Sequence, residues 1–490
     1  MYIATFSVDI SPPLGQPIGQ GFIPILETVE HPLLARGIIF KDEGQSCVVC
    51  TLDLMEVHND SYDFLRQAIG EAAGVPASHV ALQALHQHTA PAIDAAAHRF
   101  EFEEDHPGRV ATTDYIVDVA KKLTVAIRGS QDRWQPVTHI GTGKAKVERV
   151  ASNRRIERED GSIQTRSSNT KSSPALRELP EGRIDPWVRT VSLHNGDCAV
   201  AYLYYYASHP QSFYGDGRAS YDVPGIIRQR LEKKTGAFQL YLTGCGGDVA
   251  FGKYNDGSRQ ARDELTERLQ AGIEQSIADV VRTPVEPIDW SVAPMTFPPR
   301  TDEAFRETAN RRILADSKST DAQRRKAAIA LAWVERLRAE PAKPVELSCL
   351  SIGRVKMLHL PGEPFVQYQL AAQKMRPDRF VCVAGYGDCG MGYIGGDRIF
   401  TDRGGYEQTY AFAGPCEELL LTTIKGLLND DSTEEGPSAP LRGILAINED
   451  NGHFFGYKKP EEMNVRGLHA WVDQYARGAV THLFIFPNAM

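Results

Sequence analysis

Short apolar runs of strand length recur along the chain and alternate with segments of helical periodicity, and this alternation constrains the fold more than any other feature. In the segment 61–73, apolar residues are spaced as on one face of a helix. The strand-like runs lie at 37–40, 47–54, 80–85, 187–193, 199–206 and 238–242. We therefore predict an α/β fold in which a mixed β-sheet core is flanked by helices.

The composition is typical of a globular protein with a large core and argues against nucleic acid as a partner. Of the 490 residues, 42% are hydrophobic and 24% charged, and 54 basic against 63 acidic residues give a net charge of −9. This charge repels phosphate backbones. The start of the chain lacks a secretory signal, and no stretch approaches about eighteen apolar residues. We therefore expect a cytoplasmic protein without integral membrane association that acts on a small molecule.

The eight cysteines are spread too widely to suggest a disulfide framework. Cys47 and Cys50 lie within one strand-like run, which would send their thiols to opposite faces. We interpret them as reduced core residues rather than as a zinc or redox pair.

Composition along the chain suggests a domain at 1–430, a linker at 431–442 and a further segment at 443–490. Within the first domain, the polar and turn-rich stretch 155–183 is too long for a simple connector, and we expect either a lid or a disordered insert. The charged stretch 301–340 has helical periodicity and is predicted to form a helical hairpin.

The last segment, 443–490, resembles a βαβ unit. Residues 444–447 and 480–486 have the pattern of strands, and 464–477 has that of a helix with an apolar stripe. One such unit cannot bury both faces of its sheet. It either docks on the main core or begins a further domain of a longer protein.

Two histidines, His86 and His88, directly follow the strand-like run at 80–85. Residues two apart on an extended segment point the same way, so both imidazoles are expected to face one point beyond the strand end. This arrangement is typical of a metal site, although a loop that happens to begin with two histidines has the same pattern.

A third histidine and a glutamate occupy equivalent positions. His209 follows the run 199–206 and precedes Pro210, and Glu363 follows a Pro-Gly turn after the apolar run that ends at Leu360. Imidazole nitrogen and carboxylate oxygen are ligands that Zn²⁺ accepts at about 2.0–2.2 Å. Taken alone, a histidine or glutamate at a strand end is usually a solvated or hydrogen-bonded loop residue.

The order of these motifs resembles that of the neutral, non-lysosomal ceramidase family of zinc amidases, over roughly residues 3–430. The matching segments are Val8-Asp9-Ile10-Ser11-Pro12-Pro13-Leu14-Gly15, Pro32-Leu33-Leu34-Ala35-Arg36, Leu52-Asp53-Leu54, His86-Gln87-His88-Thr89-Ala90-Pro91, Asn153-Arg154, Ser208-His209-Pro210 and Pro361-Gly362-Glu363. The resemblance implies a zinc ion held by His86, His209, Glu363 and a tyrosine. The segment 384–395 offers Tyr386 and Tyr393, and we favour Tyr393.

Further roles follow from the same resemblance. His88 is the expected general acid/base or supporting group, and Arg154 and Tyr406 are candidates for holding a developing oxyanion or a substrate hydroxyl. The alternative for Arg154 is an ordinary surface ion pair. Asp248 is expected to orient a metal histidine. Cys245 is retained only as a candidate nucleophile, because a cysteine beside glycines is more often a small core residue.

One departure from the family limits the chemistry. The family has Gly-Asp-Val-Ser-Pro-Asn, whereas this chain has Ala250 in place of the serine, so acyl transfer through that position is excluded. Where the secreted members of the family carry an immunoglobulin-like β-sandwich, this sequence has the acidic linker and the βαβ-like start. We therefore predict a zinc-dependent hydrolase in which metal-activated water attacks an amide (N-acyl) or related bond of a substrate smaller and more polar than ceramide.

Other classes remain open at this point. One is a carbohydrate-active metalloenzyme, and another is a non-catalytic metal-binding or scaffold protein. A two-metal amidohydrolase barrel also uses a His-x-His motif, but on its first strand, whereas here the motif follows several elements.

Overall fold

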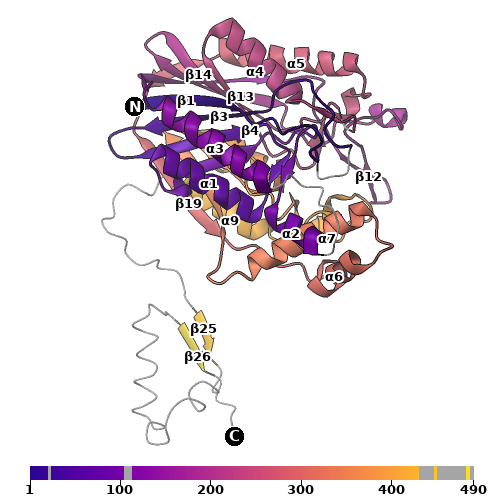
Figure 1. The fold of residues 1–490 in the computed structure, drawn as a ribbon. Helices are drawn as coiled ribbons and strands as arrows, with labels where there is room; N and C mark the ends of the chain where they lie inside the picture. The colour runs from indigo at the N-terminus through magenta and orange to yellow at the C-terminus, as the bar shows by residue number, and fades with distance from the viewer. Residues whose placement is uncertain (20–23, 104–112, 214, 430–445, 450–481, 486–490) are drawn as a thin grey trace, which may run out of the picture. The chain divides into compact units, whose positions relative to one another are not determined.

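The computed structural model describes residues 1–19, 24–103, 113–213, 215–429, 446–449 and 482–485 (Figure 1). The chain divides into two compact units, Met1–Leu428 and Asn429–Met490. The first unit contains one four-stranded and two five-stranded β-sheets, together with several two-stranded pairs. Within the described ranges, no helix is both long and apolar enough to cross a membrane.

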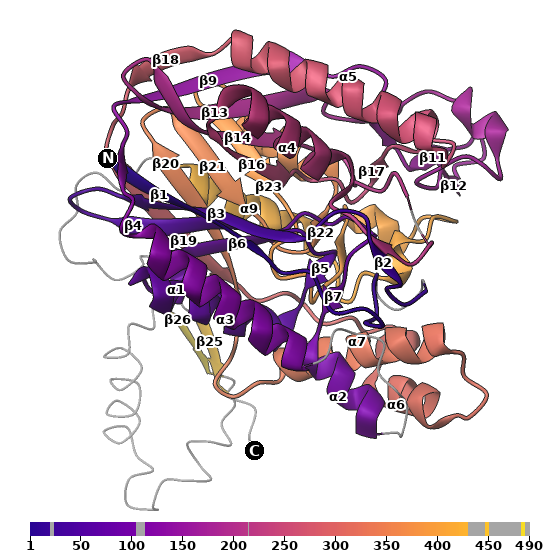
Figure 2. The ribbon, with the colours of Figure 1, turned by 45° about the horizontal axis from the view of Figure 1, so that its top comes forward.

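The first five-stranded sheet has the strand order β6-β4-β3-β1-β8. Its strands are β1 (Tyr2–Asp9), β3 (Leu34–Lys41), β4 (Ser46–Leu52), β6 (Val80–Ala84) and β8 (Gln135–Pro136). Only β4 and β6 pair in parallel, and the connection between them contains α1 (Asn59–Ala73). Helix α1 ends where Gly74 adopts a φ of 75° and donates its N–H to the Gly70 carbonyl. Together with α3 (Thr113–Ser130), α1 covers the outer face of this sheet (Figure 2).

The second five-stranded sheet has the order β16-β14-β13-β9-β18. Its strands are β9 (His139–Lys146), β13 (Trp187–Asn195), β14 (Cys198–Tyr206), β16 (Phe238–Thr243) and β18 (Val281–Pro284). Helices α4 (Asp222–Thr235) and α5 (Arg259–Ala278) cover its outer face (Figure 2). Helix α5 begins at Ser258, whose hydroxyl accepts a hydrogen bond from the Ala261 N–H.

The four-stranded sheet has the order β19-β20-β21-β23. Its strands are β19 (Ile288–Met295), β20 (Val345–Ile352), β21 (Val355–His359) and β23 (Phe380–Ala384). Its outer face packs on a helical layer comprising α2 (Ala95–Glu103), α7 (Asp321–Leu337), α8 (Val366–Met375) and α9 (Glu417–Leu428). Helix α6 (Glu307–Ala315) packs against α7.

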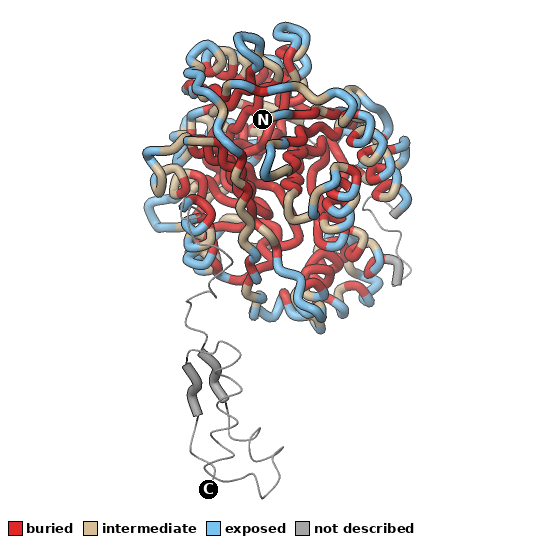
Figure 3. The backbone as a smooth tube through the Cα atoms, turned by 90° about the vertical axis from the view of Figure 1, so that its left-hand side faces the viewer, coloured by how far each residue is buried: buried red, intermediate tan, exposed pale blue. Residues whose placement is uncertain are grey.

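The inner faces of the three sheets meet in a central core, which Figure 3 shows as a buried interior in the first unit. Cys47 belongs to this core, whereas Cys50 packs on the other face of β4 against α1 and α3. The prediction that the two thiols point to opposite faces is therefore confirmed. All eight cysteines are free, and seven of them are buried.

Strand ends from all three sheets meet on one side of this core. The Ala84 N–H at the end of β6 donates to the Tyr386 carbonyl at 2.8 Å, and the Gly385 N–H after β23 donates to the Thr243 carbonyl of β16 at 2.9 Å. The Gly244 N–H then bonds to the Tyr206 carbonyl at the end of β14, at 2.9 Å. Segments that follow strands far apart in the sequence are thus tied together in one place.

Short two-stranded pairs bind the loops in the same region. They are β2 (Thr28–Val29) with β15 (Arg218–Ala219), β5 (Glu56–Val57) with β7 (Ala92–Ile93), β10 (Ser152–Asn153) with β17 (Val249–Ala250), β11 (Arg155–Glu157) with β12 (Ile163–Thr165), and β22 (Glu363–Pro364) with β24 (Tyr393–Ile394). The pairing satisfies backbone groups that loops at a buried site would otherwise leave without partners.

Several sequence predictions can be compared with this architecture. The mixed α/β fold is confirmed, and α6 and α7 form the hairpin expected at 301–340. The stretch 155–183 is not a disordered insert, because β11, β12 and buried Arg166 hold it in place. In the second unit, β25 (Ala446–Glu449) and β26 (His482–Ile485) pair in parallel, while the expected helix at 464–477 and linker at 431–442 lie outside the described residues.

Candidate metal site

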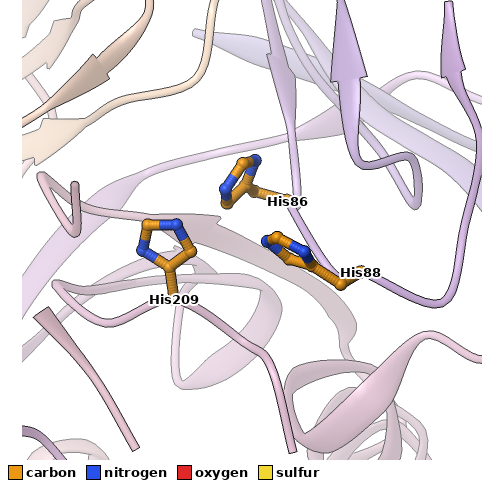
Figure 4. Close-up of side chains that lie close together, drawn as sticks. All are labelled: His86, His88 and His209. Carbon is orange, nitrogen blue, oxygen red and sulfur yellow. The ribbon is translucent and has the colours of Figure 1, made fainter. Parts of the chain in front are cut away.

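The structure brings two of the predicted histidines onto one carboxylate oxygen. Nε2 of His86 lies 3.1 Å and Nε2 of His209 lies 3.0 Å from Oε2 of Glu363. The ring of His88 lies beside them, with its centroid 5.1 Å from that of His86 and 5.7 Å from that of His209 (Figure 4). All four side chains are at least nine-tenths buried. Residues far apart in the sequence therefore converge at one buried point.

The convergence of His86 and His88 has a different backbone cause from the one expected. Strand β6 ends at Ala84, and His86 adopts a left-handed φ of 69°, so the pair does not lie on an extended segment. The two rings meet edge to face, at 83°, instead of pointing in parallel. A non-glycine residue in this conformation carries about 1–2 kcal/mol of strain, which is common at functional sites.

Glu363 is positioned by the pairing of β22 with β24, in which it lies directly opposite Tyr393. The turn before it requires Gly362, whose φ is 63° and where a Cβ atom would come within 2.7 Å of the Gly392 carbonyl oxygen. The Pro-Gly turn predicted to present the glutamate is therefore also what allows β22 and β24 to approach closely.

Backbone carbonyls fix the orientation of both histidine rings. Nδ1 of His86 lies 2.9 Å from the Met55 carbonyl oxygen, and Nδ1 of His209 lies 2.6 Å from the Gly246 carbonyl oxygen. A carbonyl can only accept, so each Nδ1 carries a proton and each Nε2 faces the shared point. This arrangement of a donated Nδ1–H and an inward Nε2 is typical of metal-binding histidines.

Asp248 does not take the orienting role that the sequence analysis gave it. Its carboxylate accepts hydrogen bonds from the Asn153 amide at 2.7 Å and from the Val366 N–H at 2.8 Å, while its own carbonyl accepts from the Arg154 N–H at 2.7 Å. The expectation that Asp248 contacts a metal histidine is thus replaced by a role in holding the Arg154 segment. Burial raises the pKa of this carboxyl to about 6, although the two hydrogen bonds oppose the shift.

The electrostatic environment differs among the three histidines. Burial opposes protonation of His86, but the adjacent Glu363 carboxylate outweighs burial and raises the pKa of His86. Burial and neighbouring positive charge hold the pKa values of His88 and His209 well below the usual range. Among the described side chains, Nε2 of His86 and Oε2 of Glu363 are buried without a hydrogen bond, despite their short separation.

A divalent ion fits these observations. Four ligands at about 2.1 Å from a tetrahedral zinc ion lie about 3.4 Å from one another, close to the separations seen here. Two overlapping groups have ligand atoms within 4.8 Å of one another, namely His86, His88 and His209, and Glu56, His86 and Glu363. His86 belongs to both groups and has one nitrogen to offer, so the two groups could hold one ion between them.

Glu56 and His58 are residues of this region that the sequence analysis missed. Nε2 of His58 lies 3.1 Å from the Glu56 carboxylate, and its Nδ1 lies 3.8 Å from that of Asp94. Although burial opposes its charge, these carboxylates raise the pKa of His58 to about 9. Both residues follow β4, so the pattern of polar residues after a buried strand, used to find His86, His209 and Glu363, was present here too.

Arg154 is buried beside the histidines, so the surface ion pair considered for it is wrong. Its Nη1 lies 3.3 Å from Nε2 of His209 and 3.5 Å from the Tyr393 hydroxyl. Its guanidinium carbon stands 4.9 Å from the ring centroid of Tyr406, whose hydroxyl is 3.1 Å from that of Tyr393. Arg154 and the two tyrosines therefore form one contiguous polar wall next to the metal ligands.

The two candidate tyrosines approach His209 from different sides. The Tyr386 hydroxyl lies 3.4 Å from Nδ1 of His209, on the side of the ring that faces the Gly246 carbonyl, and its ring stacks on His86 at 4.1 Å. The Tyr393 hydroxyl contacts the same Arg154 nitrogen that reaches Nε2 of His209. Only the Tyr393 hydroxyl is therefore near the Nε2 side.

Two other predicted features lie near the site without offering a nucleophile. Ala250 is fully buried in β17 and pairs with Ser152, so no hydroxyl is present at that position. Cys245 is fully buried in the apolar core behind the site, and burial raises the pKa of its thiol well above the usual value. The structure gives no support to Cys245 as a nucleophile.

A cavity of about 460 Å³ opens onto the site. It is lined by Met55, His58, His88, Arg154, Ser167, Ser168, Asn169, Ser172, Gln211, Glu363, Gly392, Tyr393, Tyr406, Tyr410 and Phe412. Four of these residues come from the stretch 155–183, which therefore forms a wall of the cavity.

Comparison with known proteins relates the fold to that of ceramidases. No protein-family model matches the sequence, and no curated protein matches it. The crystal structure of neutral ceramidase from Pseudomonas aeruginosa is similar over 87% of this chain and 74% of that chain, with a TM-score of 0.61 and 14% sequence identity. A ceramidase complexed with C2 is similar over 90% of this chain and 77% of that chain, with a TM-score of 0.62 and 14% identity. The chain thus has a ceramidase-like fold.

Proposed function

We propose that this chain is a zinc-dependent hydrolase that cleaves the amide bond of a small, polar N-acyl compound. The observation that carries the proposal is the convergence of the Nε2 atoms of His86 and His209 on one carboxylate oxygen in a buried, ceramidase-like site. Imidazole nitrogen and carboxylate oxygen are ligands that Zn²⁺ accepts, and their separations of about 3 Å match the spacing of ligands around one such ion.

We assign His86, His209, Glu363 and Tyr393 as the ligands of the ion. The inward Nε2 atoms support the two histidines, and the position of the Tyr393 hydroxyl on the Nε2 side of His209 supports Tyr393 over Tyr386. A bound Zn²⁺ would polarise the substrate carbonyl and make water nucleophilic at neutral pH.

The other side chains then have roles that follow from their charge and position. Burial lowers the pKa of His88, so its ring is uncharged, and its position beside His86 and His209 makes it the candidate to relay a proton from the attacking water to the leaving amine. Arg154 remains charged, and its guanidinium can stabilise the oxyanion that develops on the carbonyl oxygen. Tyr406 holds the Arg154 guanidinium against its ring.

The alanine at position 250 bears on whether a side chain or a water molecule attacks the substrate carbonyl carbon. The buried alanine on β17 has no hydroxyl, and burial raises the pKa of the Cys245 thiol, so neither position supports an acyl-enzyme. We therefore propose direct attack by water.

The proposal is tested by measuring amine release from N-acyl amino acids, an N-acyl amino sugar and a short-chain ceramide. Protein stripped with a chelator should be inactive, and zinc should restore turnover. Glu363→Ala should lose at least a thousandfold in kcat/KM, whereas Glu418→Ala, on the exposed side of α9, should match the wild type. Zinc binding without turnover on every compound would refute the catalytic role.

A further inference from the structure

We infer that the substrate is an N-acylated amino sugar, whose hydroxyl groups are read by Gln211 and by the wall formed from residues 167–172. This inference rests on the proposed hydrolase function and names its substrate class. It comes from the composition of the cavity and from two buried polar atoms that lack partners.

The cavity offers few aliphatic side chains to a long hydrocarbon chain. Among its fifteen described lining residues, Met55 alone has an aliphatic side chain. Phe412 has an apolar ring, Gly392 has no side chain, and the other twelve carry polar atoms in their side chains. Five carry a hydroxyl or amide group on a non-aromatic side chain, namely Ser167, Ser168, Asn169, Ser172 and Gln211. An acyl chain packed on this wall would strip water from hydroxyl and amide groups and give no hydrogen bond in return.

Two cavity-lining residues each have a buried polar atom that makes no hydrogen bond and could bind such a substrate. Among the described side chains, Oε1 of Gln211 and Nε of Arg154 are buried without a hydrogen bond, and both residues line the cavity. A buried polar atom without a partner destabilises the unoccupied site, and a ligand that pairs with it removes that cost. Gln211 offers an acceptor to a hydroxyl, and Arg154 offers a donor to a carbonyl oxygen. An acylated amino sugar carries both groups within one small molecule.

The polar wall is rigid, as recognition of hydroxyl groups requires. Nδ2 of Asn255 donates to the carbonyl oxygens of Ser168 at 3.0 Å and Gln211 at 3.4 Å, and so ties the two parts of the wall together. Buried Arg166 anchors the same stretch by donating to the carbonyls of Leu176 and Pro180 at 3.1 and 2.8 Å. A wall held in this way loses little conformational entropy when it binds.

Four aromatic residues also line the cavity. They are Tyr393, Tyr406, Tyr410 and Phe412. A sugar ring has hydroxyl groups at its edge and C–H groups on its face, so it can contact both the polar and the aromatic side chains of the lining. The volume of about 460 Å³ lies in the lower half of the usual range for ligand pockets, which suits one sugar ring with a short acyl group.

The experiment compares N-acetyl-D-glucosamine with N-cyclohexylacetamide, which has a ring of the same size and the same amide but no hydroxyl groups. Zinc-loaded, full-length protein should hydrolyse the sugar with a kcat/KM at least tenfold higher. In Gln211→Met that ratio should fall at least tenfold, because the amide oxygen is lost while side-chain volume is nearly kept. Gln67→Met, on the exposed face of α1, should keep the wild-type ratio.

Calorimetry with N-acetyl-D-glucosamine on the metal-free protein separates this inference from the proposed function. Binding that weakens at least tenfold in Gln211→Met, with equal secondary structure by circular dichroism, supports the inference even if turnover is absent. Equal kcat/KM for the two amides, or a preference for a short-chain ceramide, would overturn it and leave the hydrolase function standing. Absence of both binding and hydrolysis of the sugar would also overturn it.

Discussion

Replacing Asp248 by asparagine should change how the stability of the metal-free protein depends on pH. Burial raises the pKa of the Asp248 carboxyl from 3.8 to about 6. A shift of about 2 units corresponds to at most about 3 kcal/mol between the two protonation states. Because the folded pKa is above the unfolded one, the folded state holds an extra proton between pH 4 and 6. The wild type should therefore lose stability as pH rises through this window, by up to about 1.4 kcal/mol per pH unit.

The assay is urea unfolding of the wild type and Asp248→Asn in chelator, at half-unit steps from pH 4.5 to 7.5. Asparagine does not titrate. The free energy of unfolding of the variant minus that of the wild type should therefore increase as pH rises to about 6.5, and this difference should stay constant at higher pH. The variant also places its amide nitrogen against the Asn153 or Val366 donor, and this adds a cost of about 1–3 kcal/mol that does not depend on pH. Asp263→Asn, on the exposed face of α5, serves as the control. A difference between variant and wild type that is flat with pH would refute the reasoning.

Three further predictions follow from the site. Arg154→Met should retain zinc but lose about 10²–10³ in kcat/KM, because a buried oxyanion donor is removed; an unchanged rate with a full zinc complement would contradict its role. Tyr393→Phe should weaken zinc binding at least tenfold in competition with a chromophoric chelator, whereas Tyr386→Phe should change it by less than threefold, and the reverse order would exchange their roles. Iodoacetamide should label native protein at Cys198, the exposed cysteine, and labelling of Cys245 detected by peptide mass spectrometry would show that its buried position is wrong.

Much of the fold follows from local sequence patterns. The strands β3, β4, β6, β13 and β14 were predicted because each is a short apolar run, and α1 because its apolar residues share one face. The grouping of the strands into three sheets was not predictable in this way. It depends on pairings between distant segments, such as β21 with β23, which periodicity does not encode.

The candidate site was predicted in part and for partly different reasons. His86, His209 and Glu363 were predicted because each follows a strand-like apolar run. The left-handed backbone at His86 was not predicted, because the pattern was interpreted as an extended chain. The carbonyls of Met55 and Gly246, which orient the rings, are invisible in a sequence because every residue has a carbonyl group. Asp248 was given that role because carboxylates are the side chains that usually fill it.

The most direct test of a zinc site in this chain is crystallography of zinc-loaded protein with data collected on both sides of the zinc absorption edge. We predict one anomalous peak, within about 2.0–2.2 Å of Nε2 of His86, Nε2 of His209 and Oε2 of Glu363. If elemental analysis finds one zinc per chain but no peak lies there, the central claim that these side chains hold the ion would be contradicted.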